Sequence, residues 1–161
     1  MNELHQREVA LVLAPMAARD LMSANPVSIR CEATVAEATA MLTDRGFGAA
    51  PVIDEAGHPI GVVSRADILI HDRERMTHLT RLPPQVEEEG YSLEEVDPTP
   101  VADIMTPVVF AVPLDMSADQ VVAYMLSLHV HQLFVVDPTG LLVGVISALD
   151  LLRHMKKQPR G

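Results

Sequence analysis

Two Ser-x-x-Asp segments carry the residue types in this sequence that are best placed for chemistry. Ser64 precedes Asp67 by three positions, and Ser147 precedes Asp150 in the same way. At the start of a helix this spacing forms a capping box, in which the serine oxygen accepts a bond from a backbone N–H and the acid reaches back to the serine. A helix start also offers free N–H groups and a positive dipole end, which favour an anion. The same residues can therefore cap a helix, bind a ligand, or do both.

Both segments belong to an internal repeat. When the chain is aligned with itself 83 positions later, Asp67 falls on Asp150 and Ser64 on Ser147 without any gap. The other identical pairs include Asp20/Asp103, Met22/Met105, Ala40/Ala123, Val52/Val135, Asp54/Asp137, Gly57/Gly140, Gly61/Gly144, Val62/Val145 and Leu69/Leu152. These matches define two units, over about residues 18–70 and 101–153. A unit of about fifty residues buries too little apolar surface to be stable alone, so the two units should pack together.

Each unit contains the same order of predicted elements, β-α-β-β-α. The first helix of each unit is opened by an N-cap residue, Thr34 or Ser117. Two continuous apolar runs joined by a turn then predict a pair of strands covered on both faces. The predicted segments are strands 27–29, 49–53 and 60–63 with helices 35–42 and 66–80 in the first unit, and strands 108–112, 133–136 and 141–146 with helices 118–128 and 148–155 in the second.

The composition narrows the class of protein. The 161 residues are 48% hydrophobic and 21% charged, which suits a compact soluble domain. The formal net charge of −10 opposes binding to nucleic acid or to anionic lipid, because both require basic surface. The apolar run 9–14 is too short to span a bilayer. Cys31 is the only cysteine, which excludes an internal disulfide and suits a reducing cytoplasm. We therefore expect a cytoplasmic protein that binds neither nucleic acid nor membrane.

The segments outside the two units are expected to be peripheral. The predicted organisation is an N-terminal extension (1–17), a first unit with its C-terminal helix (18–81), an acidic linker (82–100), a second unit (101–155) and a basic tail (156–161). In the linker, two prolines stop the preceding helix and the run Glu87-Glu88-Glu89-Gly90 follows. A solvated loop is the simpler interpretation of residues 85–100, and a docking surface is the alternative.

The order of these motifs resembles a known family. An apolar strand is followed by Asp, a Gly turn, Gly-Val-Val-Ser-x-x-Asp and a helix, and each copy is preceded by Asp-Leu-Met-Ser or Asp-Ile-Met-Thr. This duplicated pattern resembles the tandem CBS-domain pair, or Bateman module, over about 18–70 and 101–153. The resemblance implies an α/β fold of two pseudo-symmetric units packed through their sheets. It also implies clefts between the units that bind adenosyl ligands such as AMP, ADP, ATP or S-adenosylmethionine.

The resemblance assigns ligand contacts residue by residue. By the resemblance, the ribose-binding acid of the family falls on Asp67 and Asp150. The chemistry is suitable, since a fixed carboxylate accepts hydrogen bonds from both ribose hydroxyls. A basic residue that faces phosphate falls on His131, whereas the first unit has Gly48 at that position. Adenine would lie against Val27 and Ile29 in one unit and Val109 and Phe110 in the other, although packing in the core explains these residues equally well. The predicted nucleotide-binding residues are Asp150, Ser147, His131, Val109, Phe110, Thr106, Asp67, Ser64, Arg65 and Val27.

Metal binding and catalysis have little support in the sequence. His129 and His131 alternate, so on a strand they would share a face, but no third ligand lies nearby. The sequence contains no G-x-S-x-G, no Walker-type loop and no H-E-x-x-H, and Cys31 has no neighbouring histidine to activate it. We therefore expect a protein that is not an enzyme, holds no metal and requires no cofactor.

Two functions remain open from the sequence. The first is a regulatory protein that binds an adenosyl compound and transmits the energy or metabolite state to a partner. The second is a CBS-pair platform with degenerate clefts that serves only for dimerisation or interaction. The resemblance implies a homodimer formed through helices, and the apolar residues Met41, Val122, Met125 and Leu126 form the candidate face. Packing within the monomer core is the competing explanation for that face.

Overall fold

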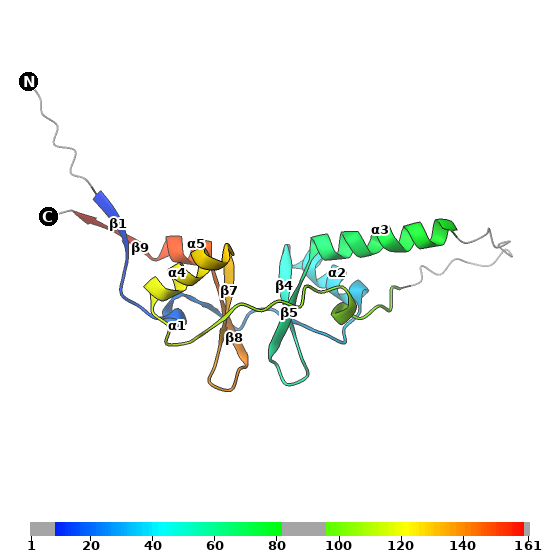
Figure 1. The fold of residues 1–161 in the computed structure, drawn as a ribbon, viewed down its shortest axis with the longest axis horizontal. Helices are drawn as coiled ribbons and strands as arrows, with labels where there is room; N and C mark the ends of the chain where they lie inside the picture. The colour runs from blue at the N-terminus through cyan, green and yellow to red at the C-terminus, as the bar shows by residue number, and fades with distance from the viewer. Residues whose placement is uncertain (1–8, 82–95, 160–161) are drawn as a thin grey trace, which may run out of the picture. The chain divides into compact units, whose positions relative to one another are not determined.

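The computed structural model describes residues 9–81 and 96–159, which fold into two compact units (Figure 1). One unit is Val27–Val109, and the other combines the chain up to Pro26 with the chain from Phe110 onward. Each unit contains one sequence repeat in the predicted order β-α-β-β-α, which confirms the predicted α/β fold. In the described ranges, no helix is both long enough and apolar enough to cross a membrane.

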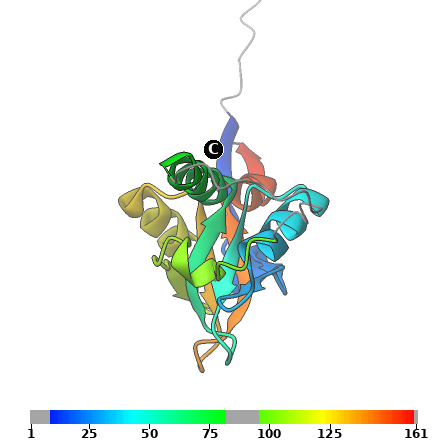
Figure 2. The same ribbon diagram turned by 90° about the vertical axis from the view of Figure 1, so that its right-hand side faces the viewer.

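The unit Val27–Val109 is a three-stranded sheet with two helices on one face. Its elements are β3 (Ile29–Arg30), α2 (Val35–Asp44), β4 (Ala49–Ile53), β5 (Pro59–Ser64) and α3 (Arg65–Arg81), followed by a short 3-10 helix, η1 (Val101–Asp103). In the order β3-β4-β5, β3 runs parallel to β4 and β4 antiparallel to β5. Figure 2 shows α2 and α3 on the viewer's side of these strands. Residues one turn apart on α2, such as Val35, Ala38 and Leu42, are buried in one cluster with Val52 of β4.

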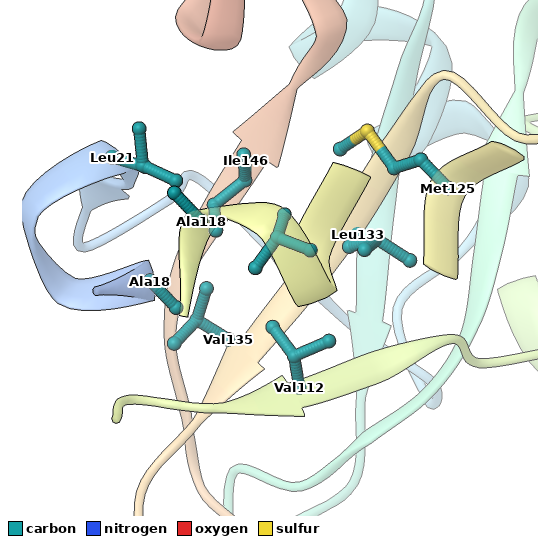
Figure 3. Packing of buried hydrophobic residues seen from close by; sticks show 9 residues of the cluster. Ala18, Leu21, Val112, Ala118, Met125, Leu133, Val135 and Ile146 are labelled. Carbon is teal, nitrogen blue, oxygen red and sulfur yellow. The ribbon is translucent and has the colours of Figure 1, made fainter. Parts of the chain in front are cut away.

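The other unit is built around a four-stranded sheet. Its elements are β1 (Val9–Leu13), α1 (Ala18–Leu21), β2 (Ser23–Ala24), β6 (Ala111–Pro113), α4 (Ala118–Leu128), β7 (Gln132–Val136), β8 (Leu142–Ser147), α5 (Ala148–Arg153) and β9 (Met155–Pro159). The strand order of the sheet is β2-β8-β7-β6. Its core gathers Ala118 and Met125 of α4, Leu133 of β7 and Ile146 of β8 (Figure 3).

The offset of 83 residues also holds for the three-dimensional elements. β4 and β7 begin and end 83 positions apart, and so do β5 and β8. Both predicted N-caps are confirmed, because the Thr34 and Ser117 side chains accept hydrogen bonds from the N–H groups of Glu37 and Gln120. The last helices differ in length. α3 continues to Arg81, whereas α5 stops at Arg153 because the chain turns there into β9.

The first residues of each repeat pack with the rest of the other repeat. α1 and β2 belong to the unit of the second repeat, where Ser23 pairs with Val145 of β8. In the other unit, Thr106 makes the equivalent bridge to Val62 of β5, through backbone hydrogen bonds of 3.0 and 2.9 Å. Each unit is therefore completed by the first residues of the other repeat.

A methionine lies over a glycine at each of these contacts. A Cβ atom added to Gly61 would stand 2.7 Å from the Thr106 carbonyl oxygen and 2.8 Å from Met105 Sδ. A Cβ atom added to Gly144 would collide with the Met22 side chain. Only glycine leaves room for so close an approach. This contact gives a physical reason for the repeated pairs Met22/Met105 and Gly61/Gly144.

The end of the acidic linker is anchored, which corrects the prediction of a solvated loop for residues 96–100. Asp97 is buried, and its Oδ2 atom lies 2.7 Å from His71 Nε2 and 2.7 Å from Arg75 Nη1, both on α3. The Thr99 N–H donates to Asp97 Oδ1 at 3.0 Å. Burial by itself raises the pKa of Asp97, but the hydrogen bonds from Thr99 and His71 and the charge of Arg75 lower it to about 2. The predicted acidic run 87–90 lies outside the described residues.

The two ends of the described chain pair with each other. β1 runs antiparallel to β9, from Val9 opposite Pro159 to Leu13 opposite Met155. The sequence predicted only a basic tail at this position, because the residues Met-Lys-Lys-Gln-Pro of β9 show no strand pattern. The described part of the tail therefore belongs to the packed unit of the second repeat.

The helix face considered for dimerisation divides between core and surface. Met125 is buried in the core of its unit, and Met41 packs against the core of the other unit. Leu126 is 70% exposed in the described part of the chain, so its side chain is accessible for an interaction. The core explanation is thus correct for Met125.

Replacement of the two close-contact glycines by alanine should destabilise the fold to different degrees. In Gly61→Ala the new Cβ meets a backbone carbonyl that cannot move without disturbing the bridge to Thr106, so we expect a loss of about 2–3 kcal/mol. In Gly144→Ala the new Cβ meets the flexible Met22 side chain, so we expect the free energy of unfolding to fall by about 1 kcal/mol. Urea unfolding measures both losses. Gly48→Ala is the matched control, because its Cβ would have no atom within 4 Å. Equal stability of Gly61→Ala and Gly48→Ala would contradict the packing.

Acid should remove the contribution of Asp97 to stability. Its pKa is about 2 in the fold against 3.8 for an ordinary aspartate, so its ionisation stabilises the fold above about pH 4 and the effect is lost as the pH falls to about 2. This difference corresponds to about 2 kcal/mol. We expect Asp97→Asn to lose about this amount at neutral pH and to flatten the dependence on pH in that range.

Unfolding by urea at several pH values tests this expectation. Asp115→Asn is the control, because Asp115 is exposed. A pH profile of Asp97→Asn that matches the wild type would show that Asp97 does not supply the acid sensitivity.

Candidate functional site

The Ser147–Asp150 segment forms a capping box at the start of α5. Asp150 Oδ2 accepts hydrogen bonds from Ser147 N at 2.8 Å and from Ser147 Oγ at 2.7 Å. Ser147 Oγ in turn accepts a bond from Asp150 N at 3.2 Å. Asp150 is only 8% exposed, and its Oδ1 atom lies 3.4 Å from Nη1 of the exposed Arg153. The carboxylate is therefore fixed through one oxygen, while the other makes only a long contact.

The Ser64–Asp67 segment repeats this geometry at the start of α3. Asp67 Oδ2 accepts bonds from Ser64 N at 2.7 Å and Ser64 Oγ at 2.6 Å, and Asp67 N donates to Ser64 Oγ at 3.3 Å. Within the described ranges, Asp67 Oδ1 has no hydrogen-bond partner. The capping interpretation is thus confirmed for both segments. Because capping occupies a single carboxylate oxygen, the second oxygen of each acid keeps its capacity to accept a bond from a ligand.

The residue just before each hairpin lies beside the helix start. The Ala148 N–H donates to the His131 carbonyl at 2.9 Å, and the Arg65 N–H donates to the Gly48 carbonyl at 3.0 Å. His131 is exposed, and it lies beside the first residue of α5. The equivalent position beside α3 carries no side chain, because it is Gly48. The start of α5 therefore has a basic group at His131 where the start of α3 has Gly48, and the start of α3 has Arg65 where the start of α5 has Ala148.

The predicted nucleotide-binding residues divide between the two units. Phe110, His131, Ser147 and Asp150 lie in the unit of the second repeat, and Val27, Ser64, Arg65, Asp67, Thr106 and Val109 lie in the other. Thr106 pairs with β5, so it lies near Ser64 in the first unit. Arg65 Nη2 lies 3.4 Å from the Leu42 carbonyl, which directs this side chain toward α2. Ile29, considered as an adenine contact, is buried in the core.

Two residues near the Ser-x-x-Asp segments, Ser23 and His71, were not identified from the sequence. Ser23 pairs with Val145 of β8, as Thr106 does with Val62, so it is the counterpart of Thr106 in the second unit. His71 on α3 is the counterpart of His154, which follows α5. The same offset of 83 positions relates both pairs and could have identified them.

The two aligned histidines make different contacts. His154 Nδ1 bonds to the Asp150 backbone carbonyl at 2.7 Å, within its own helical turn. His71 bonds through Nε2 to Asp97 instead. The lengths of the two helices explain the difference. α3 continues past His71, so the Asp67 carbonyl belongs to the helix interior, whereas α5 ends before His154.

The prediction that His129 and His131 share the face of a strand is wrong. His129 ends α4 in the left-handed conformation, with φ 55° and ψ 39°, and β7 begins only at Gln132. In the ranges that the structure describes, no group of three or more His, Cys, Asp or Glu side chains has a geometry suited to a metal ion.

Each unit contains a pocket near its Ser-x-x-Asp helix. In the first unit, a pocket of about 220 Å³ is lined by Asp67, Ile70, His71, Glu74, Asp103 and Ile104. In the second unit, an apolar groove of about 440 Å³ is lined by Leu13, Asp119, Val122, Ala148, Leu151, Leu152 and Met155. The pocket of the first unit is polar and includes the candidate carboxylate, whereas the groove of the second unit is apolar and does not include Asp150.

Comparison with known protein families gives two matches along this chain. The family model described as CBS domain matches residues 18–74 and 101–157. An uncharacterized protein of Methanopyrus kandleri is 25% identical over 138 residues, which cover 86% of this chain and 59% of that protein. An uncharacterized protein of Methanocaldococcus jannaschii is also 25% identical, over 88% of this chain. The chain spans 59% and 32% of the lengths of these two curated relatives.

Solved structures share the fold. The crystal structure of CBSX2 in complex with AMP matches with a TM-score of 0.64 and 24% identity, over 85% of this chain and 93% of that one. The cytosolic domain of the Mg²⁺ channel MgtE in complex with ATP matches with a TM-score of 0.62 and 27% identity, over 85% of this chain and 48% of that one.

Proposed function

This chain belongs to the CBS-domain family, and we propose that it is a regulatory protein that binds an adenine nucleotide, such as AMP or ATP, at its Ser-x-x-Asp helix starts. The nucleotide is a signal in this proposal and not a reactant, so the protein is not an enzyme and requires no cofactor. We further propose that the protein acts in the cytoplasm, where adenine nucleotides are available to it.

The observation that carries this proposal is the carboxylate that caps a helix with one oxygen and keeps the other for a ligand. Asp67 has this geometry, and Asp150 has it with one long hydrogen bond of 3.4 Å from the exposed Arg153 to its second oxygen. An ionised carboxylate only accepts hydrogen bonds, and a ribose presents two neighbouring hydroxyl donors, so the two groups are complementary. The AMP complex of CBSX2 and the ATP complex of the MgtE cytosolic domain support adenine nucleotides as the ligand class.

The second repeat is the better candidate for a phosphorylated ligand. His131 is exposed beside the start of α5, and a protonated imidazole at this position would attract a phosphate group. In the first repeat the corresponding position is Gly48, and Arg65 is directed toward the Leu42 carbonyl. We propose that Ser147, Asp150 and His131 bind the nucleotide of the second repeat, with Phe110 packed against its base.

Regulation requires that the ligand distinguishes two states of the protein. A ligand shifts an equilibrium only by the difference between its affinities for the two states. We propose that these states differ in association with a partner protein or with a second copy of the chain. The exposed leucines Leu126, Leu149 and Leu152 of α4 and α5, which are 70%, 53% and 62% exposed, support such an association.

Asp150→Asn should weaken nucleotide binding without unfolding the protein. The amide keeps an oxygen for the Ser147 cap but loses the negative charge toward the ribose, so we expect an affinity for AMP at least about tenfold lower. Thermal unfolding with AMP, ADP, ATP, S-adenosylmethionine and GTP gives the first measurement. A ligand at about 100 times its Kd adds about 2.7 kcal/mol, which raises Tm by roughly 5–10 °C.

Asp115→Asn is the matched control for this substitution. If no adenosyl compound shifts the Tm of the wild type, the ligand-free interaction platform becomes the better function. If AMP raises the Tm of Asp150→Asn as much as the Tm of the wild type, Asp150 is not a ligand contact.

An exchange of His131 and Gly48 should move the preference for phosphate between the repeats. His131→Gly should lower the affinity for AMP about tenfold and change the affinity for adenosine by less than about twofold. The reason is that only AMP carries the anion that His131 is proposed to face. Gly48→His should raise the affinity for AMP at the first repeat. A Cβ atom fits at this position, because no atom would lie within 4 Å of it. Isothermal titration calorimetry measures both affinities. Equal losses of AMP and adenosine in His131→Gly would show that His131 does not contact phosphate.

A further inference from the structure

The pocket beside Asp67 contains an ordered histidine that the capping motif does not explain. His71 lies one helical turn after Asp67 on α3, so the two side chains share a face of the helix. Both residues line the pocket of about 220 Å³. The His71 side chain is 15% exposed, so it belongs to the wall of this pocket and not to the open surface.

The protonation of His71 Nε2 follows from its partner. Asp97 has a pKa of about 2, so at neutral pH it is a carboxylate that can only accept hydrogen bonds. The contact of 2.7 Å between His71 Nε2 and Asp97 Oδ2 therefore places a proton on Nε2. The other ring nitrogen, Nδ1, accepts a hydrogen bond in the neutral ring and donates one in the protonated ring, and a hydroxyl group can serve as partner in either case. Within the described ranges, Nδ1 has no hydrogen-bond partner.

Asp97 is itself held in place from a second side. Arg75, one turn beyond His71, lies 2.7 Å from the same Oδ2 atom, and the Thr99 N–H bonds to Oδ1 at 3.0 Å. The carboxylate is 10% exposed, so these contacts are shielded from water. The ring of His71 is therefore held in one orientation by a charged group that is itself fixed.

The remaining charges of the pocket disfavour an anion. Glu74 and Asp103 line it together with Asp67, and His71 is the only basic side chain in the lining. Like charges at short distance repel each other strongly when they are partly shielded from water. A hydroxyl group meets no such repulsion, and it can donate to the Asp67 carboxylate or to His71 Nδ1.

We infer that His71, positioned by Asp97, determines the specificity of the first repeat, where it recognises with Asp67 the sugar hydroxyls of a nucleoside that carries no phosphate in this pocket. This inference rests on the proposed function. It assigns different ligands to the two repeats: a nucleoside at Asp67, and a phosphorylated nucleotide at Asp150. In the second repeat His154 bonds to the Asp150 backbone carbonyl, so the arrangement around His71 has no equivalent there.

The test uses the full chain with Asp150→Asn, so that binding at the first repeat dominates. Isothermal titration calorimetry with adenosine and with AMP should give an adenosine affinity at least about tenfold higher than that for AMP. His71→Gln keeps a donor toward Asp97 but has no second ring nitrogen, so it should lower the adenosine affinity about tenfold without a change in Tm. His154→Gln is the matched control and should bind adenosine as the parent does. Glu74→Gln combined with Asp103→Asn should raise the affinity for AMP and leave the affinity for adenosine unchanged.

The outcomes separate this inference from the proposed function. A wild type that binds no adenosyl compound would overturn both. Binding in the wild type that disappears in Asp150→Asn would overturn the inference and leave the second repeat as the nucleotide site. The inference is also overturned if His71→Gln binds adenosine as tightly as its parent, or if AMP binds the first repeat more tightly than adenosine does.

Discussion

The close approach of a methionine side chain to a glycine backbone holds each unit of this protein together. Met105 lies over Gly61 and Met22 lies over Gly144, and in both cases the methionine belongs to the first residues of the other repeat. Each hairpin, and hence each helix start that the hairpin positions, depends on this contact. Neither repeat has a complete unit from its own residues alone. The two copies of the repeat therefore exchange their first residues, and each covers the glycine strand of the other.

The fold and the proposed function use the two different oxygens of one carboxylate at each helix start. A buried or half-buried carboxylate needs hydrogen-bond partners, and the serine and backbone donors of the capping box supply them to one oxygen of Asp67 and Asp150. The same bonds fix the orientation of the other oxygen. A ligand then meets an acceptor that is already in place, so little conformational freedom is lost on binding. What distinguishes the two repeats is the surroundings of this common element, His131 on one side and His71 with its acidic neighbours on the other.

The repeat made much of this fold predictable from the sequence. The caps Thr34 and Ser117 and the paired strands follow from local patterns, and the offset of 83 residues confirmed each pattern by its copy. The buried ion pair of Asp97 was not predictable, because His71 and Asp97 are 26 positions apart and their contact depends on how the linker returns to α3. β9 was also not predictable, since its polar residues form a strand only because β1 offers a partner. Contacts that depend on tertiary structure, and not on the residues near them in sequence, thus account for the differences.

The pairing of β1 with β9 has a topological consequence. Val9 stands opposite Pro159, so the polypeptide enters and leaves this domain at neighbouring positions. Domains whose entry and exit points are adjacent can be placed within a loop of another protein without separating the residues on either side of that loop. A displacement of the unit of the second repeat would thus reach both ends of the described chain together, through one two-stranded ribbon.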